Sequence, residues 1–217
     1  PNAPSSAAID LGTGRTAVAV SAGAYHTCAI LDNGDLKCWG WDDYGQLGDG
    51  GTNTDTNAPS STAIDLGTGR TAVAVSAGAY HTCAILDNGD LKCWGRDNHG
   101  QLGDGGSNTD TNAPSSTAID LGTGRTMAVS ERDLDGDGVL NIFDSTPYPP
   151  TTNPSNPLPQ RNVAGFQEGS IYTNSTLSSG DEHTCAILDD ASVSCWGNNG
   201  ISQLGDGTAA ERNTPAQ

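Results

Sequence analysis

Twelve residues near the middle of the chain, 133–144, carry oxygen-bearing side chains at the spacing of a calcium-binding loop. Such side chains occupy positions 1, 3, 5, 9 and 12, and glycine occupies position 6, where a calcium loop turns sharply. Three carboxylates within five residues repel one another, and a hard divalent cation relieves that repulsion. The pattern therefore predicts Ca2+ as a cofactor, bound by Asp133, Asp135, Asp137, the backbone carbonyl of Val139, Asn141 and Asp144.

The ends of this loop indicate what kind of calcium site it would be. Position 12 is Asp144, which is shorter than the glutamate usually found there, so we expect a modest affinity. Pro147, Pro149 and Pro150 follow at once and leave no room for a flanking helix. The stretch resembles the calcium loops of thrombospondin type 3 and dockerin modules, which occur in extracellular proteins. We expect a structural calcium ion, and the alternative is a solvated acidic linker that binds nothing.

The six cysteines form three pairs with the same spacing of ten residues. The pairs are Cys28 with Cys38, Cys83 with Cys93, and Cys185 with Cys195. In the first pair, a three-residue loop ending at Gly34 would place the two cysteines directly opposite each other in a hairpin. This position is a non-hydrogen-bonded pair, where Cα atoms lie about 4.5 Å apart and a disulfide fits. We therefore predict three disulfides, each within one hairpin.

Two other states of the cysteines stay open. A zinc site is one, although a ten-residue spacing without a Cys-x-x-Cys partner is poor zinc geometry. Reduced, buried thiols are the other. Disulfides would each close a short loop and stabilise the fold by about 2–3 kcal/mol. Because disulfides persist in oxidising compartments, we expect the protein to be secreted, extracellular or bound to a cell surface.

The cysteine pairs recur because the chain is built from repeats. Residues 4–58 and 59–113 are each 55 residues long and differ at five positions. A third copy opens at Pro114, loses the repeat after Ser130 and resumes at Ser178. The sequence predicts repeat unit 1 at 1–58, unit 2 at 59–113, the start of unit 3 at 114–130, an inserted calcium loop and proline-rich connector at 131–177, and the remainder of unit 3 at 178–217.

Within a unit the apolar residues alternate with a period of two, as in β-strands. In unit 1 we predict strands at 17–21, 26–31 and 35–40, and a weaker strand at 7–11. Short strands between glycine-rich turns, repeated about every 50 residues, are typical of propeller blades. The predicted fold class is all-β: propeller-like blades of short antiparallel strands, in three units that make an incomplete ring, with an irregular calcium-loop insertion.

Composition limits both the core and the partners. Leu, Ile, Val and Phe supply only 34 of the 217 residues, which excludes a conventional large aliphatic core. Nine Lys and Arg stand against 26 Asp and Glu, for a net charge of −17. No basic patch exists to bind phosphate backbones, and no apolar run approaches the roughly 18 residues that cross a bilayer. We expect neither a nucleic-acid partner nor membrane insertion.

The stretches HTCAILDNGDLKCWG and GQLGDG carry the features of a known repeat. Unit 1 has them at Gly23, His26, Gly34, Trp39–Gly40 and Gly45–Gly48. Unit 2 matches at the corresponding positions, and unit 3 matches at Gly180, His183, Trp196–Gly197 and Gln203–Gly205, with Ala191 where the turn glycine would stand. Over about 170 residues the chain resembles the regulator of chromosome condensation repeat. The resemblance implies a β-propeller, which is seven-bladed in that family.

Three units are too few to close such a ring. Either further blades lie outside this sequence, or several chains combine. Exposed blade edges invite strand addition, so the expected partners are other copies of the chain, in a homo-oligomer or polymer, or other surface proteins or glycans. The nucleotide-exchange activity of the family's nuclear member is not expected here, because acidity and disulfides argue against contact with chromatin.

The sequences of the two nearly identical units differ mainly in one loop. Unit 1 has Trp41 and Tyr44 where unit 2 has Arg96 and His99. Variation concentrated in one loop predicts an exposed binding face, and neutral drift in a solvated loop is the alternative.

Histidine recurs in every unit, at His26, His81 and His183. A residue needed once for chemistry would not recur in every blade, so we expect these rings to hydrogen-bond the blade backbone. In the insertion, Asn174 begins an Asn-Ser-Thr sequon and is a glycosylation candidate.

These features favour a non-enzymatic secreted or cell-surface repeat protein for adhesion, binding or structural assembly, stabilised by disulfides and calcium. A propeller enzyme acting on extracellular glycans or peptides is one alternative, although the chain has no Gly-x-Ser-x-Gly, His-Glu-x-x-His or P-loop motif. A nucleotide-exchange or signalling module is the other alternative, and it would be expected to work inside a reducing cell.

Overall fold

The computed structural model describes the repeat units, without most of the segment that separates the two parts of the third. The described residues are 8–51, 53–106, 108–123, 125, 127, 176–188 and 192–215. They all belong to one compact unit. The predicted calcium loop at 133–144 and the glycosylation candidate Asn174 lie outside the described residues, so both stay predictions.

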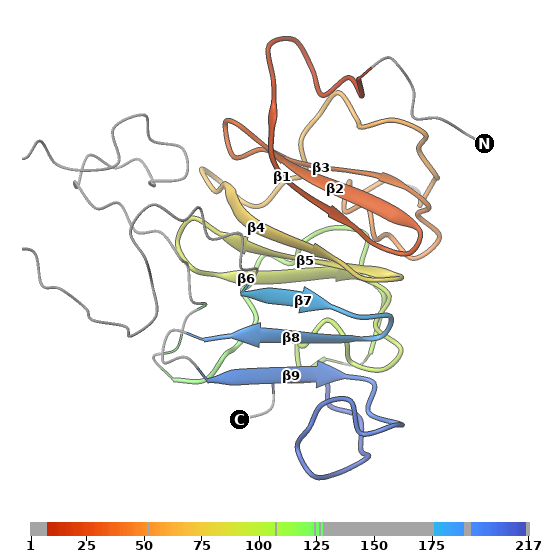
Figure 1. Ribbon diagram of the computed structural model, residues 1–217, viewed down its shortest axis with the longest axis vertical. Helices are drawn as coiled ribbons and strands as arrows, with labels where there is room; N and C mark the ends of the chain where they lie inside the picture. Colours follow the sequence, from red (N-terminus) through yellow and green to blue (C-terminus); the bar gives the residue numbers. More distant parts are fainter. Residues whose placement is uncertain are drawn as a thin grey trace, which may run out of the picture. The chain divides into compact units, whose positions relative to one another are not determined.

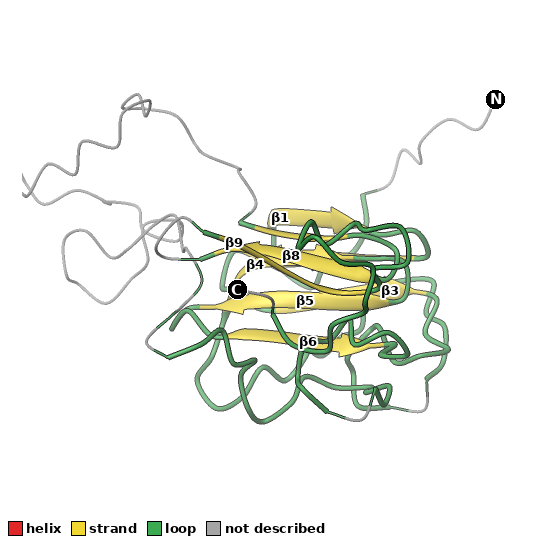
Figure 2. Cartoon of the chain, turned by 90° about the horizontal axis from the view of Figure 1, so that it is seen from below, coloured by secondary structure: helices red, strands yellow, loops and turns green. Residues whose placement is uncertain are grey.

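The described residues form three antiparallel sheets of three strands, one sheet per repeat unit, joined by loops (Figures 1 and 2). The strands are β1 (Ala17–Ala22), β2 (His26–Leu31), β3 (Leu36–Gly40), β4 (Ala72–Ala77), β5 (His81–Leu86), β6 (Leu91–Gly95), β7 (Leu177–Ser179), β8 (His183–Ile187) and β9 (Val193–Gly197). We name each sheet with its loops blade 1, 2 or 3. This arrangement confirms the all-β prediction. The described part of the chain holds no helix long and apolar enough to span a bilayer.

The hairpin of β2 and β3 has the geometry that its sequence predicts. Cys28 lies directly opposite Cys38 in the register of the two strands. The turn is closed by the Leu31 N–H, which donates to the carbonyl of Asp35 at 2.8 Å. Gly34 has a φ of 78°, a conformation that side chains with a Cβ rarely adopt. Blade 2 repeats this register residue for residue.

The weaker strand predicted at 7–11 is wrong, because residues 8–11 are not in a strand. The side chain of Asp10 accepts the N–H of Gly12 at 2.9 Å and bends this segment into a turn instead. What lies beside the last strand of each blade is a single bridge, between Gly40 and Thr56 in blade 1.

The insertion in unit 3 interrupts the first strand of blade 3 where blade 2 has a β-bulge. In blade 2 the pairing of β4 with β5 shifts register between Ala72 and Ala74. In blade 3 Met127 bridges Leu188, the place that Ala72 takes in blade 2, and β7 starts again at Leu177. A bulge already breaks the hydrogen-bonded ladder, so this is a position at which a strand accommodates extra residues.

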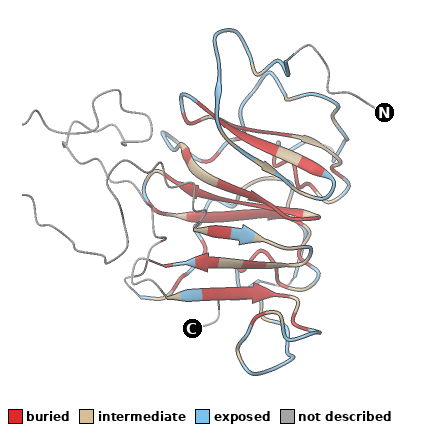
Figure 3. Cartoon of the chain, in the orientation of Figure 1, coloured by how far each residue is buried: buried red, intermediate tan, exposed pale blue. Residues whose placement is uncertain are grey.

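The apolar core lies between neighbouring blades. At the joint of blades 2 and 3, a buried cluster contains Cys83, Ile85, Leu91, Cys93 and Leu102 from one side, Leu177, Ala186, Leu188 and Trp196 from the other, and Ile119, Leu121 and Met127 from the connecting segment. Strands β5 and β6 are buried along their whole length, whereas β1 is largely exposed (Figure 3). Each blade therefore offers one face to the blade before it and one to the blade after it.

Candidate functional site

Three disulfides fix the hairpins that carry the surface loops. They join Cys28 to Cys38, Cys83 to Cys93, and Cys185 to Cys195, as predicted, with Cα atoms 4.0–4.1 Å apart. This short separation belongs to a non-hydrogen-bonded strand pair. No cysteine is left free.

A chain of buried hydrogen bonds joins blade 1 to blade 2. The Nε2 atom of His26 lies 2.7 Å from the hydroxyl oxygen of Thr82. That hydroxyl donates to the carbonyl of Gln46 at 2.8 Å, and the indole N–H of Trp94 donates to the same carbonyl at 3.0 Å. Because the threonine proton is used on Gln46, Nε2 of His26 must be the donor to Thr82. The ring therefore carries a proton on Nε2.

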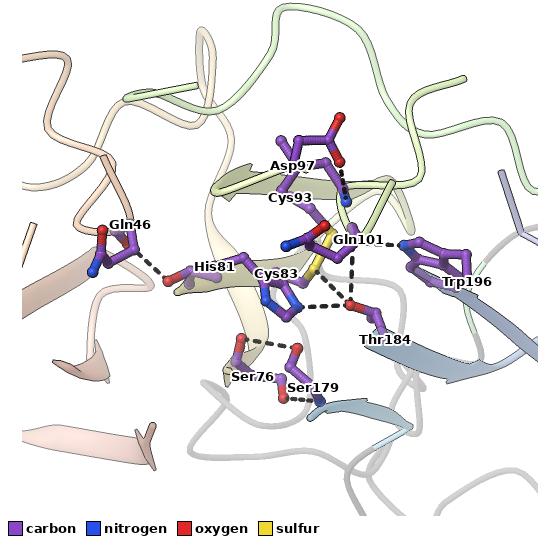
Figure 4. The surroundings of a disulfide bond; sticks show 12 residues. Gln46, Ser76, His81, Cys83, Cys93, Asp97, Gln101, Ser179, Thr184 and Trp196 are labelled. Atoms are coloured by element: carbon purple, nitrogen blue, oxygen red, sulfur yellow. Dashed lines mark hydrogen bonds between the residues drawn. A yellow bond between two sulfur atoms is a disulfide. The ribbon is translucent and has the colours of Figure 1, made fainter. Parts of the chain in front are cut away.

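The same chain recurs between blades 2 and 3 (Figure 4). His81 Nε2 lies 2.8 Å from the hydroxyl of Thr184, and the Gln101 carbonyl accepts from Thr184 at 3.3 Å and from Trp196 at 2.9 Å. The expectation that the histidines bond the blade backbone is wrong for His26 and His81. The histidine bonds a hydroxyl of the next blade, and it is this hydroxyl that reaches the backbone.

Burial determines the charge state of these histidines. Loss of solvent lowers the pKa of His26 to about 4 and that of His81 to about 3. Both rings are therefore neutral near pH 7, and the hydrogen-bond chain places the single proton of each on Nε2. They connect blades and are not placed to exchange protons with a substrate.

The loop after β3 holds the variable residues of blade 1 in position. The Asp42 carboxylate accepts the N–H of Leu47 at 2.8 Å, and the Gln46 side chain accepts the N–H of Tyr44 at 3.0 Å. Gly45 between them has a φ of 79°. Burial, reinforced by two nearby aspartates, raises the pKa of Asp42 to about 6. Asp42 is fully buried, so the loop is tied from inside while Tyr44 stays half-exposed.

Four aromatic rings from blades 1 and 2 meet beside this loop. Trp41 stands edge-on to its neighbours, with its ring centroid 5.0 Å from Tyr25 and 5.5 Å from Tyr80. Tyr25 stacks on Tyr80 at 5.2 Å, and Tyr44 is 5.8 Å from Trp41. The guanidinium of Arg96 lies 4.9 Å over Tyr44 and 5.2 Å over Tyr80. We name these five residues the aromatic surface.

Ionic contacts extend the aromatic surface onto blade 3. Arg96 pairs with Glu182 at 3.2 Å. His99 lies 3.3 Å from the same carboxylate and 2.6 Å from that of Glu211. The structure therefore brings Trp41, Tyr44 and Arg96 into one cluster, and His99 joins them through Glu182.

Sequence reasoning missed Tyr25, Tyr80 and Glu182. The two tyrosines precede the repeated histidine in units 1 and 2 and are identical there, so a comparison of those units alone shows nothing. The signal was in unit 3, where Glu182 takes the same position. Glu182 supplies the negative charge that Arg96 and His99 face. The replacement of tyrosine by Glu182 in unit 3 therefore matches the replacement of Trp and Tyr by Arg96 and His99 in unit 2.

The described blades contain no group of three or more His, Cys, Asp or Glu side chains that could hold a metal ion. What the site offers is a surface of aromatic rings in mutual contact, with one paired cation. Such a surface can contact a partner through apolar area and through ring faces.

Comparison with known proteins identifies the repeat. Two models of the regulator of chromosome condensation (RCC1) repeat match, one at residues 17–46, 72–101 and 175–202 and the other at 33–85. The first match covers the three sheets, and the second runs from the turn before β3 through the connecting loop into β5.

Two relatives align with most of this chain. The ultraviolet-B receptor UVR8 of Arabidopsis thaliana is 32% identical over 205 residues, which is 90% of this chain and 44% of UVR8. The probable E3 ubiquitin-protein ligase HERC4 of Homo sapiens is 28% identical over 210 residues, 91% of this chain and 19% of that protein. The chain therefore spans less than half the length of these relatives.

Solved structures agree on the fold. Yeast RCC1 (Prp20) bound to Kap60 superposes with a TM-score of 0.58 at 15% identity, covering 92% of this chain and 36% of that one. Prp20p from Saccharomyces cerevisiae in a second structure gives 0.56 at 17% identity, covering 94% and 37%. Repeat matches and fold lead to one conclusion: the chain belongs to the RCC1 repeat family, and its three sheets are blades of that family's β-propeller.

Proposed function

We propose that this chain is a non-enzymatic binding module that works outside the cell, in adhesion or structural assembly, and that a partner protein docks on the aromatic surface. The observation that carries this proposal is that the variable residues lie together in space. The loop positions at which units 1 and 2 differ place Trp41, Tyr44 and Arg96 in one contiguous cluster. Drift in a solvated loop would give no reason for the changed side chains to contact one another.

The chemistry of the cluster favours a protein partner. Trp, Tyr and Arg are the residues that most often dominate the binding energy of protein interfaces. Tyr25 is 51% exposed, so part of the ring area is available to a partner. The pairing of Arg96 with Glu182 and its contacts with two rings hold it in place, which lowers the entropy lost on binding.

The disulfides support an extracellular setting. All six cysteines are paired, and disulfides of this kind persist in oxidising compartments. The net charge of −17 also suits a protein that avoids anionic surfaces and nucleic acid. A structural calcium ion at 133–144 is part of this proposal and rests on the sequence pattern alone.

The relatives are consistent with a binding role. One is named an ultraviolet-B receptor, and one of the yeast structures is that of RCC1 bound to Kap60. On this proposal the shared blades are a scaffold for binding, and the loops of each member choose its partner.

Transplanting residues from unit 2 into unit 1 tests the proposal. Purified, fluorescently labelled chain is added to cells of the producing organism, and bound fluorescence is measured. The double variant Trp41→Arg/Tyr44→His should lose most of the binding, because it replaces two rings of the surface. The matched control is Asp43→Asn, which also copies unit 2 but lies outside the cluster.

Treatment of the cells separates the partner classes. Protease treatment should abolish binding and periodate oxidation of glycans should not. Full binding by the double variant would overturn the assignment of the surface. Loss of binding after periodate alone would identify a glycan partner in place of a protein.

A further inference from the structure

The exposed apolar side chains of the described residues avoid the middle blade. They are Ile9 (57% exposed), Val18 (50%), Val20 (68%), Tyr25 (51%), Ile187 (38%), Val193 (66%) and Ile201 (87%). All belong to blade 1, to the segment that leads into it, or to blade 3. Exposed apolar area concentrated in this way marks surfaces that are normally covered.

On blade 1, Val20 lies on the face that would meet a preceding blade, and Ile9 lies in the segment that leads into that face. Val20 corresponds to Val75 of blade 2, which is 9% exposed and lies in β4, the strand that contacts β1 and β2 of blade 1. Ile9 corresponds to Ile64, which is 8% exposed. Trp39 is half-buried, whereas its counterpart Trp94 is completely buried in the joint.

On blade 3 they lie on the face that would meet a following blade. Ile187 corresponds to Ile85, which is 1% exposed, and Val193 to Leu91, which is fully buried. His183 is half-exposed, whereas His81 is fully buried against Thr184. The two open faces are therefore the two halves of one joint.

The polar groups of that joint are present as well. Blade 1 presents the hydroxyl of Thr27 and the indole of Trp39, which correspond to Thr82 and Trp94 in the first joint. Blade 3 presents the ring of His183 and the backbone of Gln203, which correspond to the histidine and the glutamine that those groups bond.

Side chains at the rim of each joint are matched to one another. In the first joint Tyr44 packs on Tyr80, with ring centroids 5.5 Å apart. In the second joint the same two positions hold His99 and Glu182, whose ring nitrogen and carboxylate oxygen lie 3.3 Å apart. At the open faces they hold Ile201 and Tyr25, which are both apolar. Ile201 on the open face of blade 3 and Tyr25 on the open face of blade 1 are therefore matched in polarity, as the corresponding side chains are in the two internal joints.

We propose that the open face of blade 1 binds the open face of blade 3 of a second copy of this chain, repeating the internal joint between chains. Such a head-to-tail interface closes into a ring if its rotation permits and otherwise extends into a filament. The charge of −17 on each chain opposes association, so raised salt should promote it. This inference shares Tyr25 with the aromatic surface and rests on no other residue of that surface.

Two substitutions on opposite faces test the joint. The 22.1 kDa chain is studied by sedimentation at low and high NaCl. The wild type should form species of several chain masses, with a larger fraction at high salt. Val20→Glu blocks the face of blade 1 and Val193→Glu that of blade 3, so each variant should stay monomeric. Both sites are exposed, and circular dichroism checks that the variants fold.

Mixing the two variants gives the decisive result. Each retains one intact face, so an equimolar mixture should form a dimer of one chain of each kind and nothing larger. Ser61→Glu, which adds the same charge at an exposed site of the connecting loop, should assemble like the wild type. A wild type that stays monomeric at high salt up to its solubility limit, or a mixture that stays monomeric, would overturn the proposal.

Discussion

Replacement of Thr82 by valine should weaken the joint between blades 1 and 2, because it removes the hydroxyl while keeping the shape of the side chain. The Thr82 hydroxyl is fully buried, lies 2.7 Å from His26 Nε2 and donates to the carbonyl of Gln46 at 2.8 Å. Valine removes both contacts. The Gln46 carbonyl keeps the indole of Trp94, but the His26 N–H loses its acceptor.

The expected cost follows from these two losses. A typical hydrogen bond contributes about 1 kcal/mol net, and a buried donor left without a partner costs about 1–3 kcal/mol. We expect Thr82→Val to lower the free energy of unfolding by about 2–3 kcal/mol, and Tm by about 4–12 °C for a chain of this size. Thermal unfolding followed by circular dichroism measures both.

The chain supplies its own control. Thr27 occupies the same position in blade 1, where the described residues include no preceding blade, and it is half-buried. Thr27→Val should change the free energy of unfolding by less than about 0.5 kcal/mol when measured at concentrations that keep the chain monomeric. Equal losses in the two variants, or no loss in Thr82→Val, would refute the role of this hydroxyl in the joint.

Three further predictions address the loops, the glycines and the insertion. Asp42 has its pKa raised from 3.8 to about 6, so its contribution to stability is present below pH 3.8 and lost as the pH rises through 6. Asp42→Asn removes this loss of stability. Urea unfolding should show the stability of the variant, relative to the wild type, rising by up to about 3 kcal/mol between pH 4 and pH 8. A difference that does not change with pH would contradict the raised pKa of Asp42. A Cβ on Gly48 would lie 2.3 Å from the indole nitrogen of Trp94, whereas Gly205, with a similar φ of 71°, has nothing within 4 Å of a Cβ. Gly48→Ala should therefore lower Tm well below Gly205→Ala, and equal Tm values would remove the proposed contact. Calcium should raise the Tm of the wild type but not that of Asp137→Ala, and identical melting of the wild type in calcium and in chelator would eliminate the predicted loop site.

Local pairing was predictable from the sequence because it depends on fixed offsets. Once Gly34 ends the turn, the alternation of strand residues places Cys28 opposite Cys38 without further information. The same arithmetic gave the strands 26–31 and 35–40 to within one residue. The segment at 7–11 misled because its apolar residues fit a strand while the Asp10 side chain bends the backbone.

Contacts between blades were not predictable because every unit contains both partners. His26 and Thr27 are neighbours in one unit, yet His26 bonds Thr82 of the next. A repeat of 55 residues makes contacts within one unit and between units equally compatible with the sequence. Only the stacking of the sheets decides between them. For the same reason the sequence predicted only part of the aromatic surface, since Tyr80 and Glu182 reach it from the following blades.

The state of the cysteines in protein isolated from its native source, without reductant, tests the account most directly. Alkylation should leave the mass of the intact chain unchanged, and prior reduction should add six alkyl groups. Peptide mapping should then link each cysteine to the one ten residues away in its own hairpin. Six freely alkylated thiols in the unreduced protein, or links between different blades, would contradict both the stapled blades and the extracellular role proposed for them.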